Sequence, residues 1–305
     1  MKLVEKMILL AQMLRENEKY TLDIELSLKA QLDYFLNQKN MFKDDLLHSE
    51  LIDTTEKILA LKNRNDELLE QIHGRTKGLL RDEELKIFRR DYNLYQEHKP
   101  NYQLMIERSE HLDEELLQAV KQEVGNISRW EYAGIELNPS NGIFTRSMLS
   151  CDPLYLYTGN VTDMDAVRNR FNEFFREKRL FCYSNFKDFP QDQMGVAVSV
   201  NCYEFWPLDP IKDEMKHVFN LLRPGGMFVF TYNDCETEAS LDLCANNYRS
   251  YNTKELMSKM VEMLGFDIVR TECIRKAHSF MVVKKPGERT TQKLSAPLVT
   301  INQQF

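Results

Sequence analysis

One short segment of the chain brings a carboxylate and several aromatic side chains together. After an apolar run at residues 196–200, the sequence reads Asn201-Cys202-Tyr203-Glu204-Phe205-Trp206-Pro207. Glu204 is the only carboxylate in this segment, and a positioned carboxylate can act as a general base. We expect Tyr203, Phe205 and Trp206 to wall an apolar substrate pocket, since aromatic side chains dominate small-molecule sites. The alternative is that these aromatics pack on the following helix.

A second polar segment, Tyr232-Asn233-Asp234-Cys235-Glu236, follows another apolar run. Ligands of open α/β sheets bind at the carboxyl ends of the strands, so Tyr232 is also expected at the substrate pocket. Asp234 and Glu236 are expected to be solvated loop acids rather than catalysts.

Metal chemistry is not expected. The six cysteines are scattered without a CxxC pair, and no histidine is spaced to complete a zinc site. Buried, reduced thiols are the simpler interpretation.

The elements that position these segments are short strands alternating with amphipathic helices. We predict strands at residues 132–137, 154–158, 180–183, 196–200, 227–232, 266–274 and 279–283, and helices at 142–150, 163–178, 209–222 and 253–264. Such alternation implies a mostly parallel sheet with helices on both faces. The last two strands are joined too briefly for a crossover, so they must form an antiparallel hairpin.

This order of elements resembles the class I S-adenosylmethionine (SAM)-dependent methyltransferase family, with its seven-stranded, Rossmann-like sheet. Arg223-Pro224-Gly225-Gly226 before Met227 looks like the family's turn into its fifth strand, and Gly265-Phe266 is similarly placed before the sixth. The resemblance covers about half of the chain. It implies an α/β fold, SAM as cofactor and methyl transfer to a small molecule or a protein.

The resemblance places the cofactor loop directly after the first strand. Family members have an acid and then a Gly-x-Gly-x-Gly loop there, and the matching residues are Glu136, Asn138, Ser140 and Gly142. Only the last glycine is retained. Because Asn tolerates a positive φ, Asn138 is expected to keep the turn, whereas Ser140 adds bulk where the backbone approaches the ligand.

Further cofactor contacts are implied after the second, third and fourth strands. Thr158 stands where the family has the acid that accepts the ribose hydroxyls, with Asn160 two residues later. Replacing a carboxylate by a hydroxyl costs about 1–3 kcal/mol of binding. Asn185 matches the acid that contacts the adenine amino group, and Asn201 begins the loop that faces the methyl group.

Residues 1–125 are predicted to form a helical, coiled-coil-like arm, because they contain one proline and three glycines. One heptad seam is expected, formed by Leu51, Thr54, Ile58, Leu61, Asn65, Leu68 and Ile72. Lys57 and Lys62 would repel each other in a parallel homodimer, so a hairpin within the chain, another partner and an ordinary amphipathic helix remain open. Breaks are expected at Gly74–Gly78 and at residues 98–100, and a last helix at 101–124.

Residues 22–32 alternate apolar and polar side chains like a strand, but their residue types prefer helix. We predict helix there, with a strand as the alternative. The predicted domains are therefore the arm, residues 1–125, a methyltransferase-like domain, residues 126–286, and a polar C-terminal extension, residues 287–305.

Charge and hydropathy restrict the partners of the chain. Residues 1–125 hold 19 basic and 25 acidic side chains, and the Asn-Pro-Pro-aromatic motif of nucleic-acid amine methylases is absent, so a nucleic-acid partner is not expected. A protein partner or self-association through residues 1–125 is expected instead. No apolar run could span a membrane, which favours a cytoplasmic location. The chain also looks like methyltransferase-type proteins of tailed phages, which would imply a virion location.

Two functions follow from these features. The first is a SAM-dependent methyltransferase acting on a small molecule or protein, with Glu204 as base. The second is an inactive, methyltransferase-like protein that uses its arm and tail in an assembly, because the altered residues are the ones the family uses to hold SAM.

Overall fold

The computed structural model describes residues 46–98, 114–139, 142–159, 161–246, 249–274 and 278–287, together with residues 7–16 and scattered positions between 19 and 37. The chain divides into two compact units, Met1–Arg90 and Asp91–Phe305. Ser140, Asn160 and the C-terminal extension from residue 288 lie outside the described residues. Within the described parts, no helix has the length and apolar character needed to cross a membrane.

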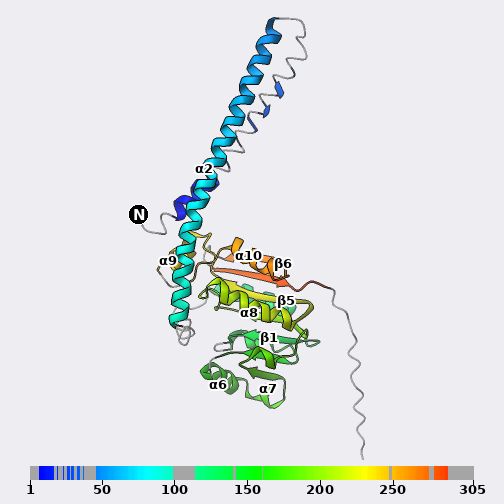
Figure 1. Cartoon of the computed structure of the whole chain (residues 1–305). Helices are drawn as coiled ribbons and strands as arrows, with labels where there is room; N and C mark the ends of the chain where they lie inside the picture. Colours follow the sequence, from blue (N-terminus) through cyan, green and yellow to red (C-terminus); the bar gives the residue numbers. More distant parts are fainter. Residues whose placement is uncertain are drawn as a thin grey trace, which may run out of the picture. The chain divides into compact units, whose positions relative to one another are not determined.

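A single long helix, α2 (Leu46–His98), contains most of the described part of the N-terminal unit (Figure 1). The predicted break at Gly74–Gly78 is wrong, because α2 continues through both glycines. A glycine weakens a helix by about 1 kcal/mol but leaves its hydrogen-bond ladder intact, so strong flanking sequence can run through it. α2 is described as far as His98, and residues 99 and 100 of the second predicted break lie outside the described residues. The described residues between 23 and 30 are helical, which supports helix rather than strand there.

The buried stripe of α2 differs from the predicted heptad seam. Leu61 and Leu68 are 65% and 50% exposed, whereas Leu69 is 9% and Thr76 5% exposed. The buried stripe therefore runs one residue further along the helix. Adjacent leucines at 68 and 69 fit two neighbouring seams equally well, so periodicity alone cannot select the one that packs. The buried stripe also contains a polar residue, Thr76, which an apolar pattern does not detect. Its hydroxyl can be buried because it donates to the Ile72 carbonyl at 2.9 Å.

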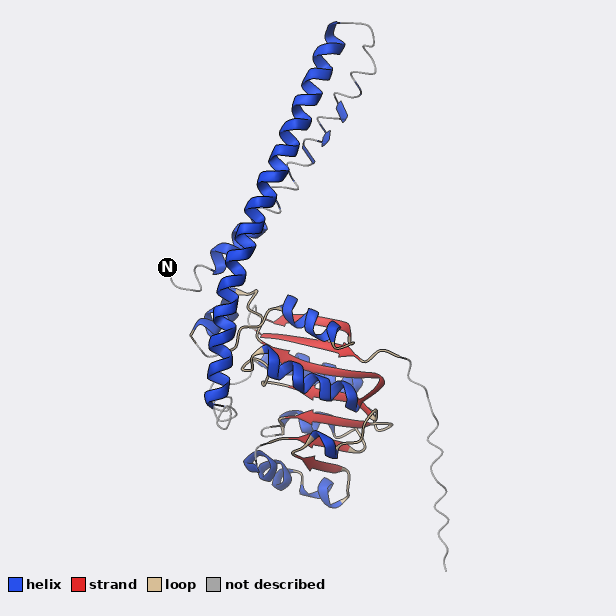
Figure 2. Ribbon diagram, viewed as in Figure 1, coloured by secondary structure: helices blue, strands red, loops and turns tan. Residues whose placement is uncertain are grey.

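The C-terminal unit contains a seven-stranded sheet (Figure 2). Its strands are β1 (Ala133–Leu137), β2 (Leu154–Tyr157), β3 (Leu180–Tyr183), β4 (Met194–Ser199), β5 (Leu222–Tyr232), β6 (Asp267–Ile274) and β7 (His278–Lys284). The strand order is β3-β2-β1-β4-β5-β7-β6. β1 to β5 pair in parallel, and β7 runs antiparallel to both β5 and β6. The predicted fold class, a mostly parallel seven-stranded sheet with a terminal hairpin, is confirmed.

The helices of this unit are α4 (Glu114–Ile127), α5 (Ile143–Met148), α6 (Val161–Arg170), α7 (Asn172–Arg176), α8 (Leu208–Leu221), α9 (Glu238–Ala245) and α10 (Lys254–Met263), with a 3-10 turn, η1, at Phe186–Asp188. One helix was expected over 163–178, but the chain divides it into α6 and α7 at Phe171, whose φ of −117° is not helical. Neither α9 nor η1 was predicted, because both are short and lack a clear apolar period.

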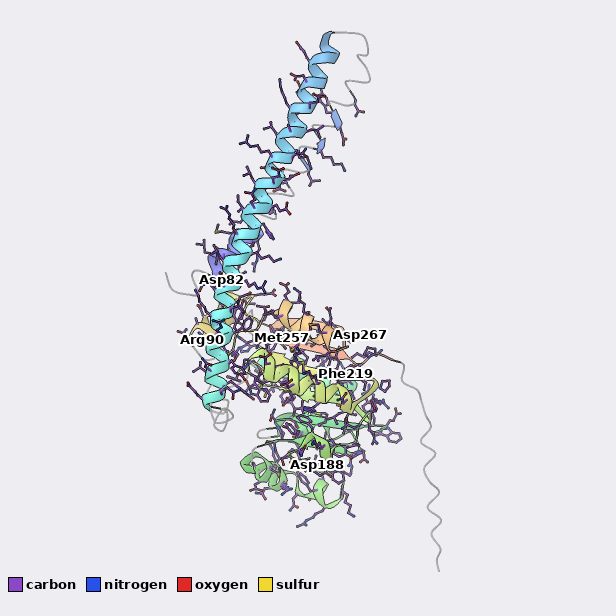
Figure 3. The ribbon with its side chains drawn as sticks, in the orientation of Figure 1. Asp82, Arg90, Asp188, Phe219, Met257 and Asp267 are labelled. Carbon is purple, nitrogen blue, oxygen red and sulfur yellow. The ribbon has the colours of Figure 1, made fainter. Side chains whose placement is uncertain are left out.

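Two apolar cores cover the two faces of the sheet. One joins the sheet to α8 and α10 through residues such as Met215 and Met257. Figure 3 labels Met257 of α10, which belongs to this core, and Phe219 of α8, which is partly buried and packs against it. The other core joins the sheet to α4, α5 and α6 through residues such as Val120, Met148 and Val167.

The boundary between the compact units differs in place from the predicted one. Sequence analysis puts it near Gly125, but Gly125 lies inside α4, and Leu116 and Val120 of this helix are fully buried in the core of the C-terminal unit. The two units instead divide between Arg90 and Asp91, within α2. Helical composition extends across this division, so composition alone could not locate it.

Candidate cofactor and acceptor site

The loop after β1 keeps its turn despite the loss of two glycines. Asn138 has a φ of 53° and Gly142 a φ of 76°, both left-handed. The expectation that Asn138 supports this turn is confirmed. Its side-chain amide also donates to the Cys202 thiol at 3.3 Å, which ties the loop to the segment after β4. A Cβ at Gly142 would lie 2.7 Å from the Phe171 ring, so packing within the chain already requires glycine here.

Glu136 is the acid of the cofactor loop and is 3% exposed in the centre of the sheet. Its carboxyl group accepts a hydrogen bond from the Thr145 hydroxyl of α5. Burial raises the pKa of Glu136 to about 8, and the hydrogen bonds from Thr145 only partly oppose this. At neutral pH the group is therefore mostly protonated and carries little charge.

The residues after β2 and β3 are engaged within the chain. Thr158, at the position of the ribose-binding acid, has no exposed surface, and its backbone N–H donates to the Tyr183 carbonyl at 3.2 Å. Asn185 is exposed, but its side-chain oxygen accepts from the Lys187 N–H at 3.0 Å and caps η1. Beside them, the Tyr157 and Phe186 rings stack with centroids 3.9 Å apart.

The segment after β4 begins with a tight turn. Asn201 has a φ of 57°, and its backbone N–H donates to the Thr231 hydroxyl at 2.8 Å. Tyr203 is fully buried, and its hydroxyl donates to Glu214 of α8 at 2.9 Å. Burial raises the pKa of Glu214 to about 7. Glu214 was not predicted, because an acid that follows Asp213 in an amphipathic helix looks like part of its solvated face.

Glu204, the predicted base, is 3% exposed. Burial raises its pKa, while the charge of Arg249 and a hydrogen bond from Thr231 partly oppose this rise. One carboxyl oxygen, Oε2, is buried without a hydrogen-bond partner. Burial therefore shifts Glu204 toward its protonated form.

Of the four aromatic residues predicted to wall a substrate pocket, three are buried in the protein. Tyr203 and Tyr232 belong to the core under α8, and Phe205 is 5% exposed. Trp206 is half-buried and packs against the same core. These positions support the alternative interpretation, in which the aromatics pack within the fold.

A strap, defined here as residues 249–253 between α9 and α10, closes over the segment after β4. Ser250 donates from its N–H to the Glu204 carbonyl at 2.8 Å and from its hydroxyl to the Phe205 carbonyl at 2.7 Å. The Asn252 amide donates to the Tyr203 carbonyl at 3.3 Å and to the Trp206 carbonyl at 3.2 Å. The carbonyl groups at 203–206 are thus all held by the strap.

The last turns of α2, which belong to the C-terminal unit, hold the strap from the other side. Asp91 is 4% exposed, and its carboxylate accepts from the Tyr251 N–H at 2.7 Å. Tyr95 meets Trp206 edge to face with ring centroids 6.0 Å apart. Burial raises the pKa of Tyr95 to about 12. Nothing in the sequence marked Asp91 or Tyr95 as part of this region, because their partners lie more than 100 residues away.

The acids after β5 are structural rather than free. Asp234 Oδ1 accepts from the Glu236 N–H at 3.2 Å and from the Lys254 N–H at 2.9 Å, at the start of α10. The expectation of a solvated loop acid is wrong for Asp234, which is 5% exposed. Among the residues that the structure describes, no three His, Cys, Asp or Glu side chains converge on a possible metal position.

The chain was compared with known proteins. No family model matches this sequence, and no curated protein is significantly similar to it. Solved structures give similar folds at low identity. An O-methyltransferase family protein from Burkholderia thailandensis is 14% identical, with 66% of this chain and 72% of that one covered and a TM-score of 0.45. A SAM-dependent methyltransferase from Mesorhizobium loti is 13% identical over 54% and 96%, with a TM-score of 0.45.

A third structure is geranyl diphosphate C-methyltransferase from Streptomyces coelicolor, 8% identical over 56% of this chain and 80% of that one, with a TM-score of 0.46. The strand order and the antiparallel β7 of the present chain decide its fold independently of these comparisons. The C-terminal unit has a methyltransferase-type fold.

SAM is the cofactor that this fold implies, but the side chains at the corresponding positions do not fit it. The ribose position carries a neutral, fully buried Thr158, and the side-chain oxygen of Asn185 is already used. Glu136 is buried and mostly protonated. Among the described residues of this site, the backbone turn is retained, while Thr158 and Asn185 stand where the family has acids, and Glu136 is buried.

Proposed function

We propose that the C-terminal unit is a methyltransferase-type domain without SAM turnover, and that it serves as the folded anchor of α2 in a protein assembly. The observation that carries this proposal is the closed rim of the sheet, by which we mean the segment after β4, residues 201–207, with the strap bound over it. Ser250 and Asn252 bind the backbone of the segment after β4, and Asp91 of α2 binds the strap between them. The surface where an acceptor would approach is occupied by the chain itself.

The chemistry of the buried acids supports the same proposal. Methyl transfer from SAM to a protonated nucleophile needs a base near the acceptor. Burial raises the pKa of both Glu204 and Glu214, and neither carboxyl group is exposed to solvent by more than a few per cent. Glu214 is in addition paired with the Tyr203 hydroxyl. A raised pKa would by itself suit a general base, so access decides: both acids are buried, and the Tyr203 hydroxyl already donates to Glu214.

Titration calorimetry and thermal unfolding with SAM and with its demethylated product test this proposal on the full chain. We expect no binding heat and no rise in Tm at millimolar ligand, because the described residues at the ribose and adenine positions, Thr158 and Asn185, are not acids. Stoichiometric heat together with a ligand-dependent rise in Tm would overturn the proposal.

A second candidate is a SAM-dependent methyltransferase acting on a small molecule or a protein. The specific observation in its favour is the loop backbone, where Asn138 and Gly142 both keep left-handed conformations after the acid Glu136. This function requires the strap to leave the segment after β4 so that an acceptor can enter. Transfer of a labelled methyl group, combined with faster hydrogen exchange at residues 249–253 on SAM addition, would favour it over the first proposal.

A further inference from the structure

Two buried cysteines meet where the loop after β5 passes α9, and neither is part of a disulfide. Cys235 follows the end of β5, and its Sγ lies 3.8 Å from the Ser240 carbonyl oxygen in α9. Cys244 follows Ser240 by four residues, so both lie on one face of the helix. Because helical side chains tilt toward the N-terminus, the Cys244 thiol leans over the turn that Cys235 contacts. The two thiol groups form a hydrogen bond.

The Cys235 thiol is held in this position from two sides. The backbone N–H of Cys235 donates to the Asn252 carbonyl of the strap at 2.7 Å, and the Asn233 side-chain amide donates to Cys235 Sγ at 3.2 Å. The same Asn233 amide donates to the Ser240 carbonyl at 3.3 Å, which ties the loop to α9. α9 itself begins with a cap, since the Thr237 hydroxyl accepts from the Ser240 N–H at 3.4 Å. Both sulfur atoms therefore lie on backbone that the fold holds in place.

We propose that Cys235 and Cys244 are a redox pair, which a peroxide oxidises to a disulfide that joins α9 to the loop after β5. The reaction balances with hydrogen peroxide as the oxidant. One sulfur attacks the peroxide and becomes a sulfenic acid as the first water leaves. The second sulfur attacks the sulfenic sulfur, the S–S bond forms, and the second water leaves. A dithiol reductant reverses the change by thiol–disulfide exchange.

The closeness of the two thiols decides which oxidation product forms. A disulfide needs sulfur atoms about 2.05 Å apart, and thiols already in hydrogen-bond contact can approach this separation by side-chain rotation. Burial raises the pKa of Cys235 well above its usual range, so its thiolate is scarce and oxidation is slow. Once either sulfur is a sulfenic acid, the neighbouring thiol captures it before a second peroxide arrives. We therefore expect slow but selective disulfide formation.

The disulfide closes a short loop over residues 235–244, beside the strap. Asn233 and Cys235 already hold the strap, because their N–H groups donate to the Ser250 carbonyl at 3.0 Å and to the Asn252 carbonyl at 2.7 Å. A covalent link from Cys235 to α9 restricts the motion that would carry these donors away. Oxidation is therefore expected to hold the strap more firmly over the segment after β4. This inference goes beyond the proposed function, since it holds whether or not the chain binds SAM.

Peptide mass spectrometry of the full chain tests the pair directly, because the tryptic peptide 217–249 contains Cys235 and Cys244 and no other cysteine. The folded protein is treated with enough peroxide to oxidise the exposed Cys273, then denatured, alkylated and digested. We expect peptide 217–249 to be unalkylated and two hydrogen atoms lighter, and dithiothreitol to restore alkylation of both thiols. Two alkylated cysteines, or sulfinic acids without the disulfide, would overturn the proposal.

Serine variants test what the disulfide does. Oxidation should raise the thermal midpoint of the wild-type C-terminal unit by about 5 °C, because the cross-link restricts the unfolded chain. Hydrogen exchange at residues 249–253 should become slower. Both effects should be lost in Cys244→Ser and kept in Cys273→Ser, the matched control at an exposed position of β6. A disulfide that changed neither the midpoint nor the exchange would refute the lock on the strap.

Discussion

Glu136 lies on β1 between two neighbouring parallel strands, and its carboxyl group accepts a hydrogen bond from Thr145. Burial raises its pKa from 4.5 to about 8, so the folded state binds the proton more tightly than the unfolded chain does. The stability contributed by this proton is fully present below about pH 4.5 and is lost as the pH rises to about 8.

The substitution Glu136→Gln removes this pH dependence, because an amide keeps the shape and hydrogen-bonding capacity of the acid but does not titrate. We expect wild type to lose a few kcal/mol relative to the variant between about pH 5 and pH 8. Urea unfolding at several pH values measures the difference. The exposed Glu173→Gln is the matched control and should show no such divergence. Parallel pH profiles for wild type and Glu136→Gln would contradict the assigned burial.

Residue types near the rim were identified from the sequence, but their environments were not. Glu204 and Tyr203 were recognised because they follow a strand, yet their partners Arg249 and Glu214 come from distant elements. Whether an acid is a free base or a buried, neutral group depends on those partners and on exclusion of water, and neither follows from local sequence.

At the level of elements, the strap is the clearest example of an irregular segment with a structural role. Residues 249–253 have no regular secondary structure, but Ser250 and Asn252 make four hydrogen bonds to the segment after β4. Asn233 at the end of β5 in turn donates to the Ser250 carbonyl at 3.0 Å. Two loops that would otherwise have unpaired backbone groups thus satisfy each other.

The substitution Asn252→Ala should lower the free energy of unfolding by about 1–3 kcal/mol, because it leaves the carbonyl groups of Tyr203 and Trp206 without this buried donor. Hydrogen exchange should become faster in residues 201–207. Asn246→Ala is the control, since exposed Asn246 donates only to the Asp242 carbonyl within its own turn. Equal effects of the two substitutions would show that the strap does not hold the segment.

α2 allows a second prediction about an element. Gly74 and Gly78 lie inside the helix, and a Cβ at either position would have no heavy atom within 4 Å apart from its chain neighbours and the nearby backbone of the helix itself. Gly74→Ala and Gly78→Ala should each stabilise the N-terminal unit by about 0.5–1 kcal/mol, because alanine loses less backbone entropy in a helix. Thermal unfolding followed by circular dichroism checks this. A loss of stability would indicate that another part of the chain, or a partner, packs closely on these glycines.

At the scale of the whole molecule, the two compact units should respond separately to core substitutions. Both tryptophans, Trp130 and Trp206, belong to the C-terminal unit, so tryptophan fluorescence follows that unit alone. Val120→Ala removes two methyl groups from a fully buried position of α4 and should cost this unit about 1–2.5 kcal/mol.

Leu69→Ala provides the comparison in the other unit. Leu69 is buried in α2 within Met1–Arg90. Its truncation should therefore lower the temperature at which the helical circular dichroism signal is lost, and it should leave the midpoint followed by tryptophan fluorescence unchanged. The Val120 substitution should move the fluorescence midpoint. If Leu69→Ala also moved the fluorescence midpoint by a similar amount, the two units would unfold as one.

The sequence by itself determined the seven strands, most of their boundaries and the terminal hairpin. These features follow from local residue preferences and from hydrophobic period, which act over a few residues at a time. It also identified the loop after β1 and the turn at Asn138, because a left-handed position restricts the residue types that can occupy it.

Only the tertiary structure decided which seam of α2 is buried, that α4 belongs to the sheet, and that the rim is closed by the strap and by Asp91. Each of these depends on contacts between residues far apart in the chain. The same distant contacts bury Glu136, Glu204 and Glu214 and raise their pKa values, so they also decide the chemistry open to the site.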